Sequence, residues 1–224
     1  MNNELVIYKR PKGSTAEAIR TLRTNIQFSL LDNSKVIMVT SSIPGEGKSF
    51  ISSNLAGAFS MIDKKVLLID CDLRKGRQSK TFGIKDEKGL SLLSLEDIKN
   101  YKKYIYKTNI DNLFILPNGI VPPNPSELLG SKKMKDLLEK LRSDYDIIVL
   151  DSPPVSAVTD ALVLTGITDK IVIVCAYNKT PIDVLNDTKK SLDGVKDKIS
   201  GVVLNKMKRE NGGKYYYYSN GYYE

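Results

Sequence analysis

One stretch near the start of the chain has the residue types and spacing of a loop that wraps around the phosphates of a nucleotide. It runs from Ser42 to Ser49 and ends in Gly-Lys-Ser. Its glycines permit a tight turn that points backbone N–H groups at phosphate oxygens. Lys48 would neutralise the outer phosphates, and the Ser49 hydroxyl would contact a magnesium ion. The residues of this loop that are predicted to bind the nucleotide are Gly45, Glu46, Gly47, Lys48, Ser49 and Phe50.

The loop departs from the general phosphate-loop pattern at one position. That pattern has a glycine five residues before the Gly-Lys pair, where this chain has Ser42. The context still favours a phosphate loop over an ordinary glycine turn, because a β-branched strand precedes it and a plausible helix follows. A dinucleotide fingerprint is excluded, since its third glycine would fall at Phe50. We therefore expect ATP or GTP as the ligand.

Three aspartates follow two apolar segments that are typical of buried strands. Asp70 and Asp72 end the first segment, and Asp151 ends the second, directly before Ser-Pro-Pro. Aspartates can end strands simply as turn formers. Ligands of open α/β sheets, however, bind beyond the carboxyl ends of the strands, so these carboxylates are expected to converge near Lys48.

The opposite end of the chain carries a cluster of candidate phosphate acceptors. The tyrosines of the last ten residues are Tyr215, Tyr216, Tyr217, Tyr218, Tyr222 and Tyr223. From Lys208 onward the sequence has no hydrophobic periodicity and little aliphatic bulk. We therefore expect a folded domain over residues 1–207 and a mobile tail over 208–224. A phosphate donor site and phosphate acceptors would then share one chain.

The composition is that of a soluble globular protein with one domain. The chain has 224 residues, of which 41% are hydrophobic and 27% charged, and a net charge of +8 that favours anionic partners in general. Its apolar runs are too short to cross a bilayer, and no secretion signal opens the chain, so a cytoplasmic location is expected. Cys71 and Cys175 are expected to be buried, reduced thiols. Because the chain has no histidine, any proton acceptor would be a carboxylate, a lysine or a tyrosinate.

Apolar segments of strand length alternate with helix-like segments along the chain. The predicted strands are 35–40, 65–70, 113–116, 145–151, 170–176 and 200–204, and the predicted helices are 14–31, 49–61, 131–142, 160–165 and 181–192. The strand segments are continuously apolar, which is typical of strands buried on both faces of a parallel sheet. The predicted fold is α/β, with a doubly wound, mostly parallel sheet flanked by helices.

The first predicted helix carries a charged pattern. Ser14 to Glu17 has the spacing of a capping box. Glu17, Arg20 and Arg23 lie three residues apart and can present one face of the helix. Spacing alone favours a solvated face with local ion pairs.

Taken together and in this order, the motifs resemble those of the bacterial tyrosine kinases, which have a P-loop NTPase fold with deviant Walker motifs. The segments that carry the resemblance are 41–49 for the first nucleotide motif, 70–74 for an extra aspartate motif, 151–154 for the second nucleotide motif, and the C-terminal tyrosine cluster. Glu17, Arg20 and Arg23 also fit the pattern through which this family forms rings. The resemblance covers nearly the whole chain.

The resemblance implies an ATP-dependent protein-tyrosine kinase that phosphorylates its own tyrosine cluster in trans within a homo-oligomeric ring. Ser49 would bind Mg²⁺ directly, Asp72 and Asp151 would bind it directly or through water, and Asp70 would orient or deprotonate the incoming tyrosine. Asn205 and Lys206 resemble the position that holds the adenine base in related proteins. The family further implies a membrane adaptor of polysaccharide co-polymerase type, which recruits the kinase to the inner face of the membrane, and protein substrates in capsular or extracellular polysaccharide synthesis.

Two other classes of function compete with the kinase. A ParA- or MinD-like positioning ATPase shares the fold superfamily, but its members usually carry an extra lysine early in the phosphate loop, where this chain has Ser42 and Ile43. The tyrosines beside Lys208, Arg209 and Lys214 could also stack on single-stranded nucleic acid. The complete motif order favours the kinase, and no nucleic-acid partner is predicted.

Overall fold

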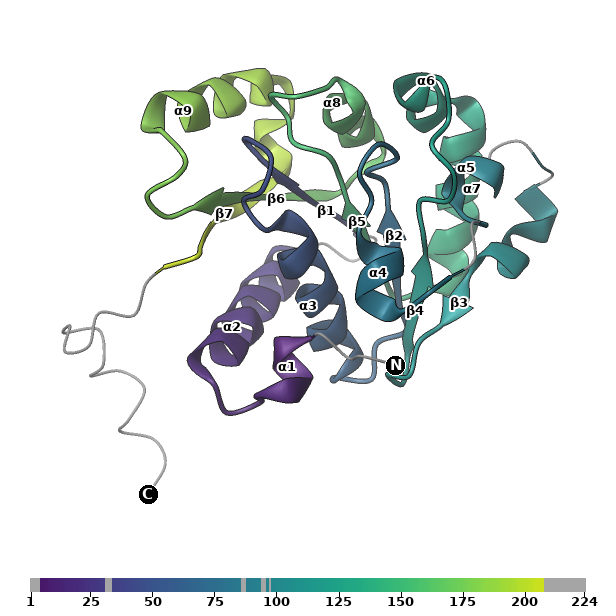
Figure 1. The fold of residues 1–224 in the computed structure, drawn as a ribbon, viewed down its shortest axis with the longest axis horizontal. Helices are drawn as coiled ribbons and strands as arrows, with labels where there is room; N and C mark the ends of the chain where they lie inside the picture. The colour runs from purple at the N-terminus through teal and green to yellow at the C-terminus, as the bar shows by residue number, and fades with distance from the viewer. Residues whose placement is uncertain (1–4, 31–33, 86–87, 94–95, 97, 208–224) are drawn as a thin grey trace.

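The computed structural model describes residues 5–30, 34–85, 88–93, 96 and 98–207, which form one seven-stranded sheet with helices on both faces (Figure 1). The strands are β1 Val36–Ser41, β2 Val66–Asp70, β3 Tyr106–Lys107, β4 Leu113–Leu116, β5 Ile147–Asp151, β6 Lys170–Ala176 and β7 Ile199–Asn205. The α-helices are α1 Val6–Lys9, α2 Ser14–Ser29, α3 Lys48–Ser60, α4 Gln78–Phe82, α5 Leu90–Leu93, α6 Pro125–Gly130, α7 Lys132–Asp144, α8 Asp160–Leu164 and α9 Ile182–Ser191. The 3₁₀ helices are η1 Ile98–Tyr104, η2 Thr165–Ile167 and η3 Asp193–Lys198.

The sheet has the order β3-β4-β2-β5-β1-β6-β7, and its neighbours are parallel except for the β3–β4 pair. Successive residues of β1 pack into two different cores: Val36 and Met38 face one cluster, whereas Ile37 and Val39 face the other. Burial on both faces explains why the strand sequences are continuously apolar. The predicted α/β fold is therefore confirmed.

Two layers of helices cover the sheet. Ile7 of α1, Ile19 of α2 and Leu55 of α3 belong to the core on one face, and Leu137 of α7 and Leu164 of α8 belong to the core on the other. Figure 1 shows α1, α2 and α3 together below the sheet, with α8 and α9 above it. The carboxyl ends of β1, β2 and β5 thus lie between the two layers, where the loops that follow them meet.

The element boundaries differ from the predicted ones mainly in α2 and in the shortest elements. The N-cap of α2 is Gly13 and not Ser14, so the predicted capping box does not form, and α2 ends at Ser29 with residues 31–33 outside the described ranges. The segments α4, α5 and β3 were not predicted, because two to five residues are too few to establish a hydrophobic period.

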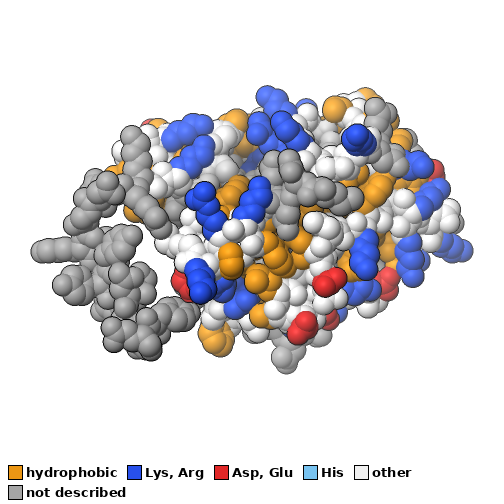
Figure 2. Space-filling view, turned by 60° about the horizontal axis from the view of Figure 1, so that its bottom comes forward, with side chains coloured by type: hydrophobic (Ala, Val, Ile, Leu, Met, Phe, Trp, Pro, Cys, Tyr) orange, Lys and Arg blue, Asp and Glu red, His pale blue; other side chains and the backbone are white. Residues whose placement is uncertain are grey.

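Several predictions from composition can be compared with the structure. Cys71 and Cys175 are buried and free, as expected. Among the described helices, none combines the length and the apolar character that a membrane crossing requires. On the face that Figure 2 shows, Lys and Arg side chains are many and acidic side chains few, in keeping with the net charge of +8.

Asp169 ties the start of β1 to the end of α7. Its Oδ2 atom accepts hydrogen bonds from the backbone N–H groups of Lys35 at 2.7 Å and Val36 at 2.8 Å. The Arg142 guanidinium binds both carboxylate oxygens, at 2.7 and 2.9 Å. Partial burial disfavours the charged carboxylate and by itself would raise the pKa of Asp169. The hydrogen bonds from the Arg142 guanidinium and the two backbone N–H groups outweigh this effect, so the pKa is lowered.

We expect Asp169→Asn to lower the free energy of unfolding at pH 7 by about 2 kcal/mol, because it weakens hydrogen bonds to a charged group. Since the pKa of Asp169 is lower in the folded chain, its stabilisation is present above the unfolded pKa and is lost as the pH falls through the folded value. Urea unfolding at pH 7 and at pH 3 measures both effects, and the gap between wild type and variant should narrow at pH 3. The control is Asp187→Asn, whose pair with Lys190 is exposed and should contribute little. An equal decrease in the free energy of unfolding in Asp169→Asn and Asp187→Asn would contradict this role of Asp169.

Candidate active site

The predicted phosphate loop connects the end of β1 to the start of α3. Gly45 and Gly47 have φ angles of 80° and 98°, in the region that favours glycine. A Cβ atom on Gly47 would lie 2.2 Å from Nδ2 of Asn205, so a larger residue would also clash there. The loop ends at Lys48, the first residue of α3, which directs the helix N-terminus toward the loop. The backbone therefore has the shape and polarity that a phosphate group needs.

Glu46 braces the loop through a buried carboxylate. Its Oε2 atom accepts from the N–H of Ile43 at 2.8 Å, and Oε1 accepts from the N–H of Ala176 at 3.2 Å and from the hydroxyl of Thr180. These bonds tie the loop to the end of β6. The side chain is thus engaged within the protein, and a contact of Glu46 with the nucleotide would come from its backbone.

Three side chains donate to three consecutive carbonyl groups of the loop. Lys179 donates to Pro44 O at 3.0 Å, Lys206 to Gly45 O at 2.6 Å, and Asn205 to Glu46 O at 2.8 Å. The end of β7 and the loop before α9 therefore lie beside the phosphate loop. The family resemblance implies that Asn205 and Lys206 hold the adenine base, which stays a prediction. Lys179 was not predicted, since no recognisable motif surrounds it.

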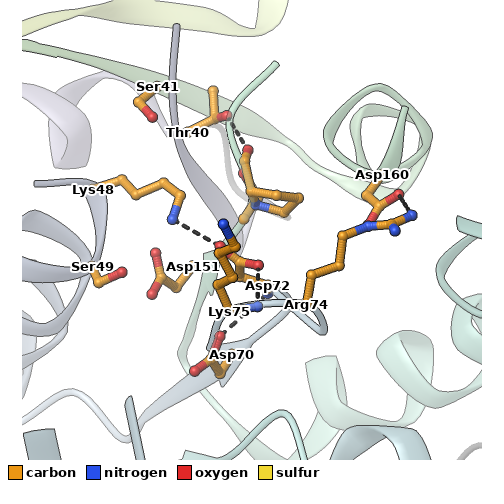
Figure 3. Close-up of polar contacts among 12 residues, drawn as sticks. Thr40, Ser41, Lys48, Ser49, Asp70, Asp72, Arg74, Lys75, Asp151 and Asp160 are labelled. Carbon is orange, nitrogen blue, oxygen red and sulfur yellow. Dashed lines mark hydrogen bonds and ion pairs between the residues drawn. The ribbon is translucent and has the colours of Figure 1, made fainter. Parts of the chain in front are cut away.

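The structure brings Lys48 and the three aspartates together at the carboxyl end of the sheet (Figure 3). Asp70 and Asp151 are register partners on the adjacent strands β2 and β5. The Nζ atom of Lys48 lies 3.0 Å from Oδ2 of Asp72, and both side chains are largely buried. The backbone N–H of Lys75 donates to the other oxygen of Asp72 at 2.9 Å, which fixes the carboxylate opposite Lys48.

Asp70 lies deeper than Asp72 and has both oxygens engaged. The N–H of Asp72 donates to Oδ1 at 3.2 Å, and the N–H of Gln78 donates to Oδ2 at 2.9 Å. Complete burial, followed by the nearby charge of Asp151, raises the pKa of Asp70 well above its usual value. Burial also raises the pKa of Asp151, although the charge of Lys48, the hydrogen bond from Gln78 and the neighbouring Ser49 hydroxyl oppose this rise.

The donor atoms of this cluster fit a magnesium ion that is shared with a nucleotide. Oδ1 of Asp151 is buried and has no hydrogen-bond partner among the described residues, although buried carboxylate oxygens are normally satisfied. Within the described ranges no group of three or more His, Cys, Asp or Glu side chains could hold a metal ion by itself. Magnesium commonly binds through one or two carboxylates together with substrate phosphates and water. Asp151, Asp72 and the Ser49 hydroxyl would supply such a set.

Arg74 anchors the loop that follows β2. Its Nε and Nη2 atoms bind the two carboxylate oxygens of Asp160 at 3.1 and 3.3 Å. Asp160, the first residue of α8, is fully buried and also accepts from the hydroxyl of Ser126 on α6. These contacts join the loop that follows β2 to α6 and α8 beside the site. Sequence reasoning missed Asp160, because a carboxylate at a helix start is more often a cap.

The charged residues of α2 make contacts within their own chain. Arg20 binds Glu17 at 2.7 Å and the carbonyl of Pro11 at 2.6 Å. Nη1 of Arg23 donates to Ala58 O of α3 at 3.3 Å. A role of these residues in an oligomer therefore stays a prediction, as does the role of the six C-terminal tyrosines, which lie outside the described residues.

A family model described as an AAA domain matches residues 34–204. The tyrosine-protein kinase YwqD of Bacillus subtilis is 37% identical over 219 residues, which cover 97% of this chain and 92% of that protein. The kinase domain of the Escherichia coli tyrosine kinase ETK superposes with a TM-score of 0.89 at 31% identity and covers 96% of this chain and 84% of that one. The cell division ATPase MinD of Pyrococcus furiosus superposes less well, with a TM-score of 0.64 at 28% identity over 80% of this chain and 74% of that one.

Proposed function

The chain belongs to the bacterial tyrosine-protein kinases, and from this premise we propose that it transfers the terminal phosphoryl group of ATP to tyrosines of its own C-terminal cluster. The observation that carries the proposal is the meeting of Lys48, Asp72 and Asp151 at the end of the phosphate loop. A nucleotide-binding cradle, a cation and carboxylates in one place are the parts that phosphoryl transfer needs. The acceptors lie in the same chain, at Tyr215 to Tyr218 and at Tyr222 and Tyr223.

In this proposal the backbone of residues 45–50 holds the phosphates, and Lys48 neutralises the charge that develops on the transferred group. Ser49, Asp72 and Asp151 would hold a magnesium ion, which would supply further charge neutralisation. Asn205 and Lys206 lie at the edge of the loop, where they can contact the base or ribose of ATP. Positioning and charge neutralisation account for most of the catalysis in this reaction class.

We propose tasks for the two neighbouring aspartates that differ from those that the family resemblance implies. Both oxygens of Asp70 bind backbone N–H groups, and the side chain is inaccessible. Asp72 is nearly as buried, but only one of its oxygens accepts from a backbone N–H group, that of Lys75, and the other pairs with the Lys48 side chain. We therefore assign Asp72 to face the acceptor hydroxyl as well as the metal, and Asp70 to hold the loop that carries Asp72. A carboxylate in this position can take the proton of a phenol whose ordinary pKa is about 10.

The tail that follows Met207 would be phosphorylated by a neighbouring subunit in a ring. Glu17, Arg20 and Arg23 would contribute to the contact between subunits, as the family resemblance implies. A membrane adaptor of polysaccharide co-polymerase type would recruit the kinase to the inner face of the cell membrane. Its further substrates would be proteins of capsular or extracellular polysaccharide synthesis.

The test is phosphosite mapping by mass spectrometry after incubation of the full chain with magnesium and ATP. We expect phosphate on the C-terminal tyrosines, with a higher yield when the cytoplasmic peptide of the adaptor is added. ATP hydrolysis without any phosphotyrosine, with and without that peptide, would instead support a MinD-like positioning ATPase. A tail that stays unmodified in both conditions overturns the proposal.

A further inference from the structure

Gln78 lies at the centre of the site, although no motif pointed to it. It is the first residue of α4, and its side chain is completely buried. Its backbone N–H donates to Asp70 Oδ2 at 2.9 Å. Its side-chain Nε2 lies 2.7 Å from Asp151 Oδ2, 3.1 Å from the carbonyl of Ser49 and 3.2 Å from the Ser52 hydroxyl.

This single residue therefore links three parts of the site. Its backbone holds Asp70 at the end of β2, and its amide holds Asp151 at the end of β5 and the first turn of α3. The orientation of the amide follows from its neighbours, since both the Asp151 carboxylate and the Ser49 carbonyl are acceptors and require the NH₂ group. A neutral hydrogen-bond donor suits this position for two reasons. A cationic side chain would compete with the magnesium ion for the Asp151 carboxylate, and an apolar side chain would leave one carboxylate oxygen without a hydrogen bond.

Two acceptor atoms of the cluster have no donor among the described residues. They are Oε1 of Gln78 and Oδ1 of Asp151, and both are buried. An unsatisfied buried acceptor costs about 1–3 kcal/mol, so two of them in one cluster indicate that something else satisfies them. A hydrated magnesium ion offers what they lack, since the ion binds carboxylate oxygen and its water molecules donate hydrogen bonds.

We propose that Gln78 is a positioning residue for the kinase reaction: it fixes Asp151 by one oxygen, so that the other oxygen is free to meet the hydrated magnesium ion of the nucleotide. The amide also ties Asp151 to the helix turn that carries Lys48 and Ser49, so that the metal and phosphate contacts form together. This inference rests on the proposed assignment of Asp151 to magnesium. The residue acts through Asp151 and does not itself contact the reacting atoms.

The test measures ADP affinity by calorimetry, with magnesium and with EDTA, so that it does not depend on kinase activity. In Gln78→Met, which keeps the size of the side chain, we expect metal-free ADP affinity within about twofold of wild type. The gain in affinity that magnesium brings should fall by about tenfold, which is the lower end of the range for partners of metal ligands. Ser52→Ala serves as the matched control, since it removes a neighbour of the amide but leaves its bond to Asp151, and should change the gain by less than about twofold.

A second arm repeats Gln78→Met in the Asp151→Asn background. If Gln78 acts through Asp151, the Gln78→Met substitution should not reduce the magnesium gain any further in the Asp151→Asn background. The effects of two substitutions that act on the same group are not additive. An unchanged magnesium gain in Gln78→Met, or an equal loss in both backgrounds, overturns the inference. Weaker metal-free binding with a lowered melting temperature would show a purely structural role and overturns it as well. If Asp151→Asn alone leaves the magnesium gain intact, the assignment of Asp151 fails instead.

Discussion

Lys48→Met should lower the rate of tail phosphorylation by about 10³-fold, since one preorganised charged contact to the transferred group is removed. Methionine keeps the length of the side chain but offers no charge to the phosphates and leaves Asp72 without its partner at 3.0 Å. The measurement is quantitative phosphotyrosine detection over time at saturating ATP. The matched control is Lys64→Met, an exposed lysine between α3 and β2, which should retain wild-type activity. A rate for Lys48→Met within tenfold of wild type contradicts the assigned role.

The double variant Arg20→Ala with Arg23→Ala should give monomers whose tails are phosphorylated slowly. In a ring, neighbouring tails are present at an effective concentration in the mM range, whereas monomers at about 10 µM meet ~100-fold less often. Light scattering measures the molar mass of the oligomer. In the variant, the initial phosphorylation rate should become proportional to the square of the protein concentration.

Arg23 also donates to Ala58 O, so its loss could weaken the contact between α2 and α3 without any effect on assembly. Thermal unfolding at one protein concentration separates the two effects. The control is Arg10→Ala with Lys12→Ala, which removes two exposed positive charges just before α2 and should leave the oligomer intact. An unchanged oligomer in the Arg20 and Arg23 variant rules out the proposed interface.

The sequence was sufficient to predict the sheet, because its strands are buried on both faces and read as continuous apolar runs. The segments Leu113–Leu116 and Lys170–Ala176 were predicted with their observed bounds. The order of the strands, the antiparallel β3 and the short α4 were not predicted. They depend on contacts between segments far apart in the chain, which no local period records.

The same distinction applies to the site. Lys48, Asp72 and Asp151 could be predicted, since each stands at a fixed place in a motif after an apolar strand. Gln78 and Lys179 could not, because an isolated glutamine or lysine in a loop has no pattern. The different hydrogen-bond partners of Asp70 and Asp72 could not be predicted either, since they depend on which backbone N–H groups turn back to each carboxylate.

The contacts of Asn205 and Lys206 with the phosphate loop have a practical consequence for shortened versions of the chain. Only Met207 separates these two residues from the tail that carries the tyrosines. A deletion that begins after Met207 removes the acceptor tyrosines and keeps both contacts, whereas one that extends through Asn205 also removes the hydrogen bonds to Gly45 and Glu46. Inactivity of the longer deletion would therefore also reflect the loss of these contacts to the phosphate loop, whereas the shorter deletion leaves them in place.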